Sequence, residues 1–463
     1  MLKEELCHDM IRAALSRGGD YCDVFFESKT PLSISLEDGN IERFFTGNDT
    51  GVGIRVISRN KSCYAYTNEL TSGALLDAAS GLALAVIGRK PKDITLNLVR
   101  SKPAIDFAIL KPPVSIKAEE KTDLVMRADR AARALADKIR QVSVSYHDYI
   151  QRVMIVNSEG LLCEDERVQS LFTVTVVASD EGITQSAYES AGGFTGFELF
   201  DSINVEELSI KAAKRALMML RADRIQGGRM PVVISSEAGG TMIHEAIGHG
   251  LEADLTGQGL SVYAGKLGER VASDAVTVID DGTMPGKRGS YRFDDEGTHS
   301  GRNVLVENGI LVKYMNDRLW AMKDGAAPTG NGRRESYKYR PIPRMTNTYL
   351  AAGSDKAEDA FKGIKEGLFV KKMGGGQVNT VTGDFVFDVQ EGFLIKDSCN
   401  TGQLVRGATL CGNGPEVLRS IDFISSDLGF AIGTCGKDGQ GVPVTDALPT
   451  IRIPEIVVGG ASR

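Results

Sequence analysis

Residues 241–250 read TMIHEAIGHG and place His244 and His249 five positions apart, with Glu245 directly after the first histidine. A common zinc-binding helix carries the pattern H-E-x-x-H, in which the two histidines lie four residues apart on one helical face. At about 100° per residue, a spacing of five leaves the side chains roughly 140° apart on a straight α-helix, which is too wide for one ion. We therefore expect either a π-type turn, which aligns residues five apart, or a break near Gly248, where glycine tolerates distortion.

A third ligand must come from elsewhere, because a catalytic zinc ion usually has three protein ligands and one open position. The candidates are Glu252, Asp254, Cys399, Cys411 and Cys435. Cys435 is favoured because it lies among small residues in GTCGKDG (433–439), which we predict to be a loop that could bring a thiolate close to an ion. Cys411 fits a buried strand, and Cys399 fits a polar turn. The two carboxylates remain alternatives at this point.

The chain changes character on either side of this motif. A loop reading RIQGGRM at 224–230 is the predicted boundary between a domain of residues 1–225 and a domain of residues 226–463. A buried strand at 231–235 and a glycine turn lead into the helix that carries the motif. From about residue 270 onward, short apolar stretches alternate with Gly, Asn and Asp turns, which is typical of an antiparallel β-rich domain.

The first half of the chain mixes helical and strand-like periodicity. Helices are predicted at about 2–17, 70–88, 120–140 and 204–222, and strands at 21–27, 32–36, 41–45, 53–57 and between 141 and 190. The predicted fold class is therefore α+β. An N-terminal mixed α/β domain is followed by a β-rich C-terminal domain that carries the zinc helix.

Composition limits the possible partners. The chain has 54 Lys plus Arg against 61 Asp plus Glu, and this net charge of -7 gives no electrostatic support to a nucleic-acid or anionic-membrane partner. The first residues, MLKEELCHDM, contain no apolar signal segment, and no run is long enough for a membrane helix. The seven cysteines are scattered, as is usual for reduced thiols. We expect a cytoplasmic protein that binds neither nucleic acid nor membrane.

Several longer motifs resemble one known family. The helix sequence TMIHEAIGHGLEAD is similar to the TldD/PmbA family of peptidases, and so are SYRFDDEGT (290–298), PTGNGRRESY (328–337), GDFVF (383–387) and GTCGKDGQGVPV (433–444). The N-terminal stretches LEDGNIERF and GVGIRVIS are similar too, so the resemblance covers nearly the whole chain. One departure is His299, which stands where we expect proline in the family.

The resemblance implies a zinc ion bound by His244, His249 and Cys435, with Glu245 as the catalytic residue. Zinc with three protein ligands lowers the pKa of its bound water from about 15.7 to about 7. Glu245 would accept the proton of this water and later pass it to the leaving amine. The expected reaction is therefore the hydrolysis of peptide bonds.

The resemblance also implies substrates and partners. Small or unfolded peptides are the expected substrates, in antitoxin degradation or in the maturation of peptide antibiotics. Because the zinc-binding residues are present, the chain is similar to the metal-retaining subunit type of the family. We expect a homodimer, or a heterodimer with a PmbA/TldE-type paralogue. The alternative is a non-catalytic regulatory or scaffold subunit with a structural zinc, which would normally need four protein ligands.

Three further features have no assigned role. The acidic stretch 294–296 could bind a hard cation or orient metal ligands, but a solvated turn or an ion pair with Arg292 or Arg302 is favoured. The pair Arg333-Arg334 fits a bidentate anchor for a substrate carboxylate and a structural salt bridge equally well. His299 is expected to be structural.

Overall fold

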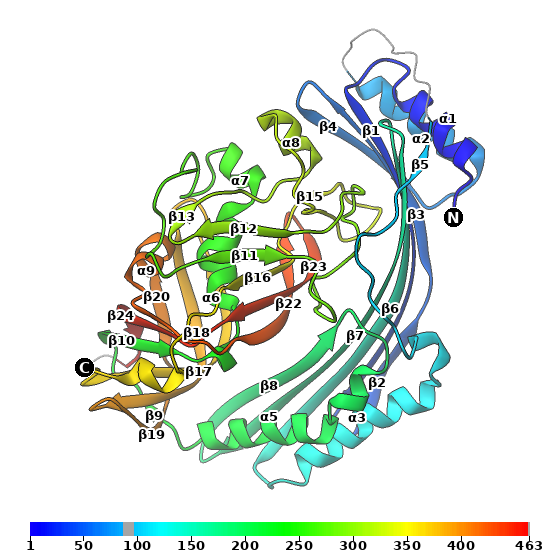
Figure 1. The fold of residues 1–463 in the computed structure, drawn as a ribbon. Helices are drawn as coiled ribbons and strands as arrows, with labels where there is room; N and C mark the ends of the chain where they lie inside the picture. Colours follow the sequence, from blue (N-terminus) through cyan, green and yellow to red (C-terminus); the bar gives the residue numbers. More distant parts are fainter. Residues whose placement is uncertain (87–96, 462–463) are drawn as a thin grey trace.

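The computed structural model describes residues 1–86 and 97–461, in which a long, curved sheet lies along one side of a β-rich body (Figure 1). The sheet has the strand order β4-β3-β1-β6-β7-β5, with β2 paired to β1 and β8 paired to β7. Its strands are β1 (Tyr21–Glu37), β2 (Asn40–Thr46), β3 (Asp49–Ser58), β4 (Lys61–Thr67), β5 (Val99–Arg100), β6 (Ile139–Asn157), β7 (Leu161–Asp180) and β8 (Ile183–Gly193). All neighbours pair antiparallel except β5 and β7.

Two helix pairs cover this sheet, one pair near each end (Figure 1). The first pair is α1 (Glu4–Ala14) and α2 (Ser72–Ala85), and the second is α3 (Ala118–Arg133) and α5 (Val205–Met219). The short helical segment η1 (Pro113–Ser115) precedes α3 in the chain, and α4 (Leu199–Ser202) precedes α5. Each pair buries an apolar face against the strands, and Met10 and Leu124 are examples. The side chains of Thr71 and Asn204 accept backbone N–H groups where α2 and α5 begin.

The structure confirms that the segments predicted in this half are helices and strands, but several of them begin or end at other residues than predicted. The expected strands at 21–27 and 32–36 are parts of one long strand, β1. The expected helix at 120–140 corresponds to α3, which ends at Arg133, and Ile139 is already the first residue of β6. Residues 87 and 88 of the expected helix at 70–88 lie outside the described residues.

The second half of the chain forms two larger sheets and one small one. The first has the order β17-β10-β24-β20-β18-β19-β9, and a further pairing of β17 with β18 closes five of its strands into a ring. Its strands are β9 (Asp223–Arg224), β10 (Gly228–Ile234), β17 (Glu366–Val378), β18 (Asp384–Lys396), β19 (Cys399–Arg406), β20 (Thr409–Asn413), β21 (Phe423–Ile424) and β24 (Ile451–Gly459).

The second sheet has the order β13-β12-β11-β16-β23-β22, which makes β22 an edge strand among the described residues. Its strands are β11 (Val278–Asp281), β12 (Arg302–Glu307), β13 (Ile310–Leu311), β16 (Asn347–Leu350), β22 (Gly429–Lys437) and β23 (Gln440–Leu448). A separate pair joins β14 (Gly332–Arg333) to β15 (Ile342–Pro343). Most pairings are antiparallel, as expected, but β10 with β17, β16 with β23 and β9 with β19 are parallel.

The helix that carries the histidine motif lies in the core between these sheets (Figure 1). It starts as α6 (Thr241–Ile243), continues as a π turn (His244–Gly248) and ends as a 3-10 turn (His249–Leu251). Its apolar residues Met242, Ile247 and Leu251 are fully buried. The other helical segments of this half are η2 (Ser236–Ala238), α7 (Ala253–Gly257), α8 (Arg318–Asp324), η5 (Ala357–Phe361) and α9 (Gly414–Ser420).

The α+β fold class is confirmed by these sheets and helices. The domain boundary between residues 225 and 226 stays a prediction. Within the described ranges, no helix is both long and apolar enough to cross a membrane.

Candidate metal centre

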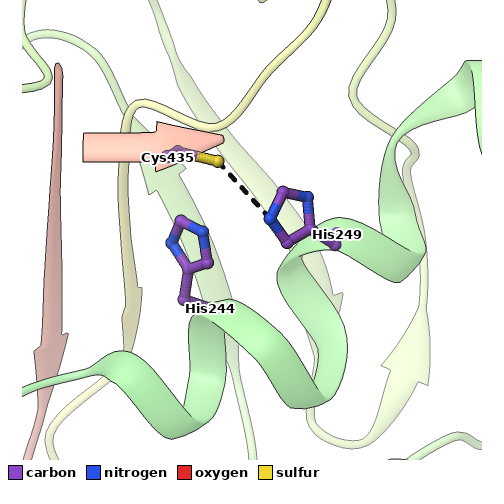
Figure 2. Close-up of side chains that lie close together, drawn as sticks. All are labelled: His244, His249 and Cys435. Carbon is purple, nitrogen blue, oxygen red and sulfur yellow. Dashed lines mark hydrogen bonds between the residues drawn. The ribbon is translucent and has the colours of Figure 1, made fainter. Parts of the chain in front are cut away.

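The π turn brings the two histidines together. Over His244–Gly248 the helix widens, and the two imidazole rings lie 4.8 Å apart between centroids at an interplanar angle of 85° (Figure 2). Of the two expected distortions, the π turn is therefore the one that forms. A turn with i→i+5 bonds aligns residues five apart, which is the histidine spacing in this chain.

Gly248 serves this turn for a reason other than the expected one. Its φ of -54° and ψ of -59° are ordinary helical values, so the backbone makes no use of glycine's freedom. A Cβ at this position would lie 2.2 Å from Sδ of Met345, which is fully buried. Gly248 thus allows the helix to pack closely against Met345.

Cys435 reaches the histidines from strand β22, so the expected loop is wrong for residues 433–437, and only Asp438 and Gly439 form a turn. Along this strand the side chain of Cys435 is buried while Thr434 and Gly436 on either side are exposed, which is the alternation of a pleated strand. Sγ of Cys435 lies 3.4 Å from Nε2 of His249 (Figure 2). The ligand atoms of His244, His249 and Cys435 all lie within 4.8 Å of one another.

Each imidazole is oriented by a carboxylate on its far side. Nδ1 of His244 lies 2.8 Å from Oδ1 of Asp446, and Nδ1 of His249 lies 2.9 Å from Oε2 of Glu252. A carboxylate accepts, so each Nδ1–H donates, and each Nε2 is left to face the position of a metal ion. Sequence analysis did not identify Asp446, which comes from strand β23.

Glu252 and Asp254 lie outside the group of candidate ligand atoms formed by His244, His249 and Cys435. Nζ of Lys437 donates to Oε2 of Glu252 at 3.0 Å and to Oδ1 of Asp254 at 2.6 Å. Glu252 is thus engaged by Lys437 as well as by His249. This geometry favours Cys435 over either carboxylate as the third ligand. Lys437 was also missed, although it stands two residues after Cys435.

The charged groups of the cluster shift one another's protonation. Burial raises the pKa of Cys435, but hydrogen bonds and charges of His244 and His249 outweigh it and lower the pKa to about 5. Burial lowers the pKa of His249, but the Glu252 carboxylate and Cys435 outweigh it and raise the pKa to about 9. The protein groups therefore favour the thiolate, which is the form of cysteine that binds metals.

Glu245 lies on the same turn, between the two histidines in sequence, and is half-buried. Burial raises its pKa above the ordinary value, and the two histidines only partly oppose this effect. Catalytic glutamates that accept protons are commonly tuned upward in this way. The position of Glu245 beside both histidines makes it the candidate for a proton-accepting role.

The donor set and its spacing fit a zinc ion. Tetrahedral bonds of about 2.3 Å to sulfur and about 2.0 Å to nitrogen place such ligand atoms about 3.5 Å apart. The separation of 3.4 Å between Sγ of Cys435 and Nε2 of His249 agrees with this value. Two imidazoles and one thiolate suit zinc, and three protein ligands leave a fourth position for a substrate or water.

The remaining motifs of the sequence lie elsewhere. His299 stacks on Phe293 with ring centroids 4.7 Å apart, and its Nε2 lies 3.2 Å from Oγ of Ser101. The acidic stretch 294–296 is fully buried, so the expected solvated turn is wrong. Its partners are not Arg292 or Arg302, because Asp295 pairs with Arg167 and Glu296 pairs with Arg55.

The two arginines of the 328–337 motif behave differently. Arg334 contacts Asp23 at 3.5 Å and donates to the backbone oxygen of Asp295, as a structural salt bridge would. Arg333 donates only to backbone oxygens, those of Met345 and Pro443, among the described residues. A carboxylate therefore engages one member of the pair and not the other.

Comparisons with known proteins identify the family. Models of the PmbA/TldA metallopeptidase match in three parts: domain 1 at residues 22–86, the central domain at 111–220 and the C-terminal domain at 227–460. A "Metalloprotease TldD homolog" of Haemophilus influenzae is 38% identical over 96% of this chain and 94% of its own. A "Zinc metalloprotease TldD homolog" of Saccharolobus solfataricus is 28% identical over 97% of this chain and 99% of its own.

Solved structures share the fold at low identity. A protein of Thermotoga maritima described as a modulator of DNA gyrase gives a TM-score of 0.78 at 22% identity, covering 95% of this chain and 96% of the other. TldE from Thermococcus kodakarensis gives a TM-score of 0.76 at 19% identity, covering 98% of this chain and 100% of the other. With three matched domains and a relative 38% identical along nearly its whole length, the chain belongs to the PmbA/TldD family of metallopeptidases.

Proposed function

We propose that this chain is a zinc-dependent peptidase in which His244, His249 and Cys435 hold the metal and Glu245 is the general base. The observation that carries the proposal is the convergence of two imidazoles and a buried thiolate, with 3.4 Å between Sγ of Cys435 and Nε2 of His249. The relatives named as metalloproteases, one of them a zinc metalloprotease, support the same reaction.

The residues around the proposed zinc position have different roles in hydrolysis. A zinc ion held there would supply a Lewis acid that lowers the pKa of water and polarises the scissile carbonyl. Glu245 would accept a proton from the attacking water and return it to the leaving amine, since its raised pKa suits both steps. Asp446 and Glu252 keep the two imidazoles oriented and their Nδ1 atoms protonated.

The position of Cys435 favours an extended peptide as substrate. Cys435 lies on β22, the edge strand of its sheet in the described part of the chain. An extended peptide can add to such an edge through main-chain hydrogen bonds, which select for unfolded or short chains and not for sequence. We therefore propose small or unfolded peptides as substrates, including the antitoxins and peptide-antibiotic precursors that the family resemblance implies.

We further propose a dimer, with itself or with a PmbA/TldE-type paralogue, in the cytoplasm. The likeness to TldE supports a partner of the same fold. The free state of the seven cysteines supports a reducing compartment.

A non-catalytic subunit with a structural zinc is the competing reading. Structural zinc sites normally have four protein ligands, and the cluster in the described residues has three. A glutamate with a raised pKa beside the ligands also has no purpose in a closed structural site.

The decisive experiment compares the wild type with Glu245→Gln, each purified with its native partner. We expect the variant to keep its zinc and to lose about 10²–10⁴-fold in kcat for peptide cleavage, the usual share of a general base. Metal analysis and a fluorogenic peptide assay provide the two measurements. Equal activity in both proteins would rule out the role of Glu245.

A further inference from the structure

A basic cavity lies where the N-terminal sheet faces the β22–β23 hairpin. Its volume is about 390 Å³, and its lining comes from β1, β6 and β7 on one side and from Arg288, Arg333, Thr434 and Pro443 on the other. Five basic and two acidic side chains line it among the described residues. The cavity therefore carries an excess of positive charge in a partly enclosed space.

Most of the cavity's charges are already engaged. Nη1 of Arg167 donates to Oδ1 of Asp295 at 2.6 Å, and Arg334 contacts Asp23 at 3.5 Å. Of the two acidic groups, Asp295 is taken by Arg167, and Glu335 accepts the backbone N–H of Gly441 at 2.6 Å. Lys29, Arg288 and Arg333 remain, and no carboxylate of the described chain lies within ion-pair distance of any of them. Lys29 is half-buried and lies over the ring of Tyr149, 4.2 Å from its centroid, so Arg288 and Arg333 are the two buried cations without a counter-charge.

Arg288 and Arg333 are buried against neutral acceptors only. Arg288 is 8% exposed and Arg333 is 6% exposed. Arg288 donates to the oxygen of Gly433 at 3.2 Å and to Oε1 of Gln169 at 3.3 Å, while Arg333 donates to the oxygen of Pro443 at 2.8 Å. Buried guanidinium groups without a counter-charge carry a desolvation penalty that a bound anion would relieve.

The pKa values of these arginines are shifted in the opposite direction from that of a paired neighbour. Burial lowers the pKa of both Arg288 and Arg333, and the charge of Arg333 lowers that of Arg288 further. Arg167 is also largely buried, but its pKa is raised because Asp295 and Asp165 outweigh the burial. The contrast reflects the missing counter-charge at the first two residues.

The cavity lies one residue along β22 from the metal ligand. Arg288 contacts Gly433 and Thr434, which directly precede Cys435, and Arg333 contacts Pro443, the cross-strand neighbour of Thr434. Thr434 and Cys435 face opposite sides of the strand. In a peptide lying beside β22, neighbouring residues also face opposite sides, so a residue next to the cleavage point would project toward the cavity.

We propose that Arg288 and Arg333 form a subsite that binds a carboxylate of the peptide substrate, from its C-terminus or from an acidic side chain. This inference rests on the proposed peptidase function and adds a preference within it. Two guanidinium groups suit a carboxylate because each can donate two parallel N–H bonds to it. Tyr149 in the cavity wall supplies a further hydrogen-bonding group.

The test uses three peptides of the same length on the zinc-loaded protein with its native partner. One peptide has a free C-terminal carboxylate, the second has a C-terminal amide, and the third has the amide and an internal glutamate. We expect kcat/KM for at least one carboxylate peptide to exceed that of the plain amide about tenfold, mainly through KM. The peptide that shows the preference identifies the source of the carboxylate.

Variants then assign the preference to the two arginines. We define the preference as kcat/KM for the carboxylate peptide divided by kcat/KM for the amide peptide. In Arg288→Met and Arg333→Met this ratio should fall toward one, and Arg333→Lys should keep part of the preference. Arg221→Met, an exposed arginine outside the cavity, should keep the wild-type ratio. A wild-type ratio of one, or a ratio that stays high in both methionine variants, would overturn the proposal.

A binding measurement tests the carboxylate subsite independently of the proposed peptidase activity. Calorimetry of the carboxylate and amide peptides on zinc-loaded Glu245→Gln needs no cleavage, so an inactive protein would still show the preference. If the peptides are cleaved but bind equally, the subsite is refuted while the peptidase stands. A fourth peptide, which has the C-terminal amide and an internal phosphoserine, is included in the calorimetry. If it binds more tightly than both carboxylate peptides, the assignment of the subsite to a carboxylate is wrong.

Discussion

At the scale of single residues, the proposed metal centre includes groups beyond its three candidate ligands. Asp446 and Glu252 each hold the Nδ1 atom of one histidine, and Lys437 in turn holds Glu252. These contacts fix the tautomer and the direction of each ring, which a zinc ligand requires. Loss of either carboxylate should therefore weaken metal binding without removing a ligand.

Asp446→Asn tests this point. The amide keeps the size of the carboxylate but removes its charge, so we expect zinc affinity to fall about 10–100-fold. Competition with a chromophoric chelator measures the affinity. Asp438→Asn, an exposed residue in the turn after Lys437, is the matched control and should leave the affinity unchanged. Equal affinities in Asp446→Asn and the control would contradict the positioning role.

Asp317 sets a pH dependence of stability that is independent of the metal. It is buried, and burial together with the charge of Glu296 raises its pKa to about 8. The folded protein then binds a proton that the unfolded chain releases above about pH 4. This contribution to stability is complete below pH 4 and is lost as the pH rises toward 8.

Asp317→Asn should remove much of that loss. The side chain of Asp317 caps α8 by accepting the N–H of Trp320 at 2.9 Å, and asparagine is an equally good cap. We expect the decrease in unfolding free energy between pH 6 and pH 9 to be smaller by about 2 kcal/mol in the variant. Urea denaturation at the two pH values measures it. An unchanged difference would show that Asp317 is ionised in the folded protein.

At the scale of elements, the sequence predicted that the helix is distorted between the two histidines, but it placed Cys435 in the wrong kind of element. The five-residue spacing of His244 and His249 left two possible distortions, because a straight α-helix separates them. Cys435 was expected in a loop, since its glycine neighbours disfavour a strand by propensity. Cross-strand pairing with Val442 holds it in β22 despite that propensity. Such pairing depends on tertiary contacts and not on local sequence.

Gly248→Ala tests how closely the π turn is packed. The added Cβ would meet Sδ of Met345 at 2.2 Å, and Met345 is fully buried. We expect a loss of about 1–3 kcal/mol in unfolding free energy and weaker zinc binding, because the turn must shift. The double variant Gly248→Ala/Met345→Val makes room for the methyl group and should lose less than the sum of the single variants. Additive losses would place the strain elsewhere.

At the scale of the whole molecule, buried ion pairs join the N-terminal sheet to the β-rich body. Arg55 on β3 lies 2.6 Å from Glu296, and it also donates to Asp23 on β1 at 2.7 Å. The backbone N–H of Tyr337 donates to Glu27 at 2.7 Å across the same junction. These pairs join residues far apart in the chain, so no local pattern could have predicted them. The α+β class was predictable because it depends on local periodicity alone.

Arg55→Met should therefore weaken the whole molecule and not one part of it. The change leaves Glu296 buried without its cation and leaves Asp23 with only Arg334 at 3.5 Å, and breaking such a buried pair typically costs about 3–5 kcal/mol. Arg229→Met, which removes an exposed pair with Glu455, should cost less than about 1 kcal/mol. Urea denaturation can follow Trp320, the chain's single tryptophan, in the body and far-UV circular dichroism for the entire chain. Both signals should shift to lower urea together, because the junction couples the sheet to the body. A Trp320 transition that stays at the wild-type position would show that the body's stability does not depend on these ion pairs.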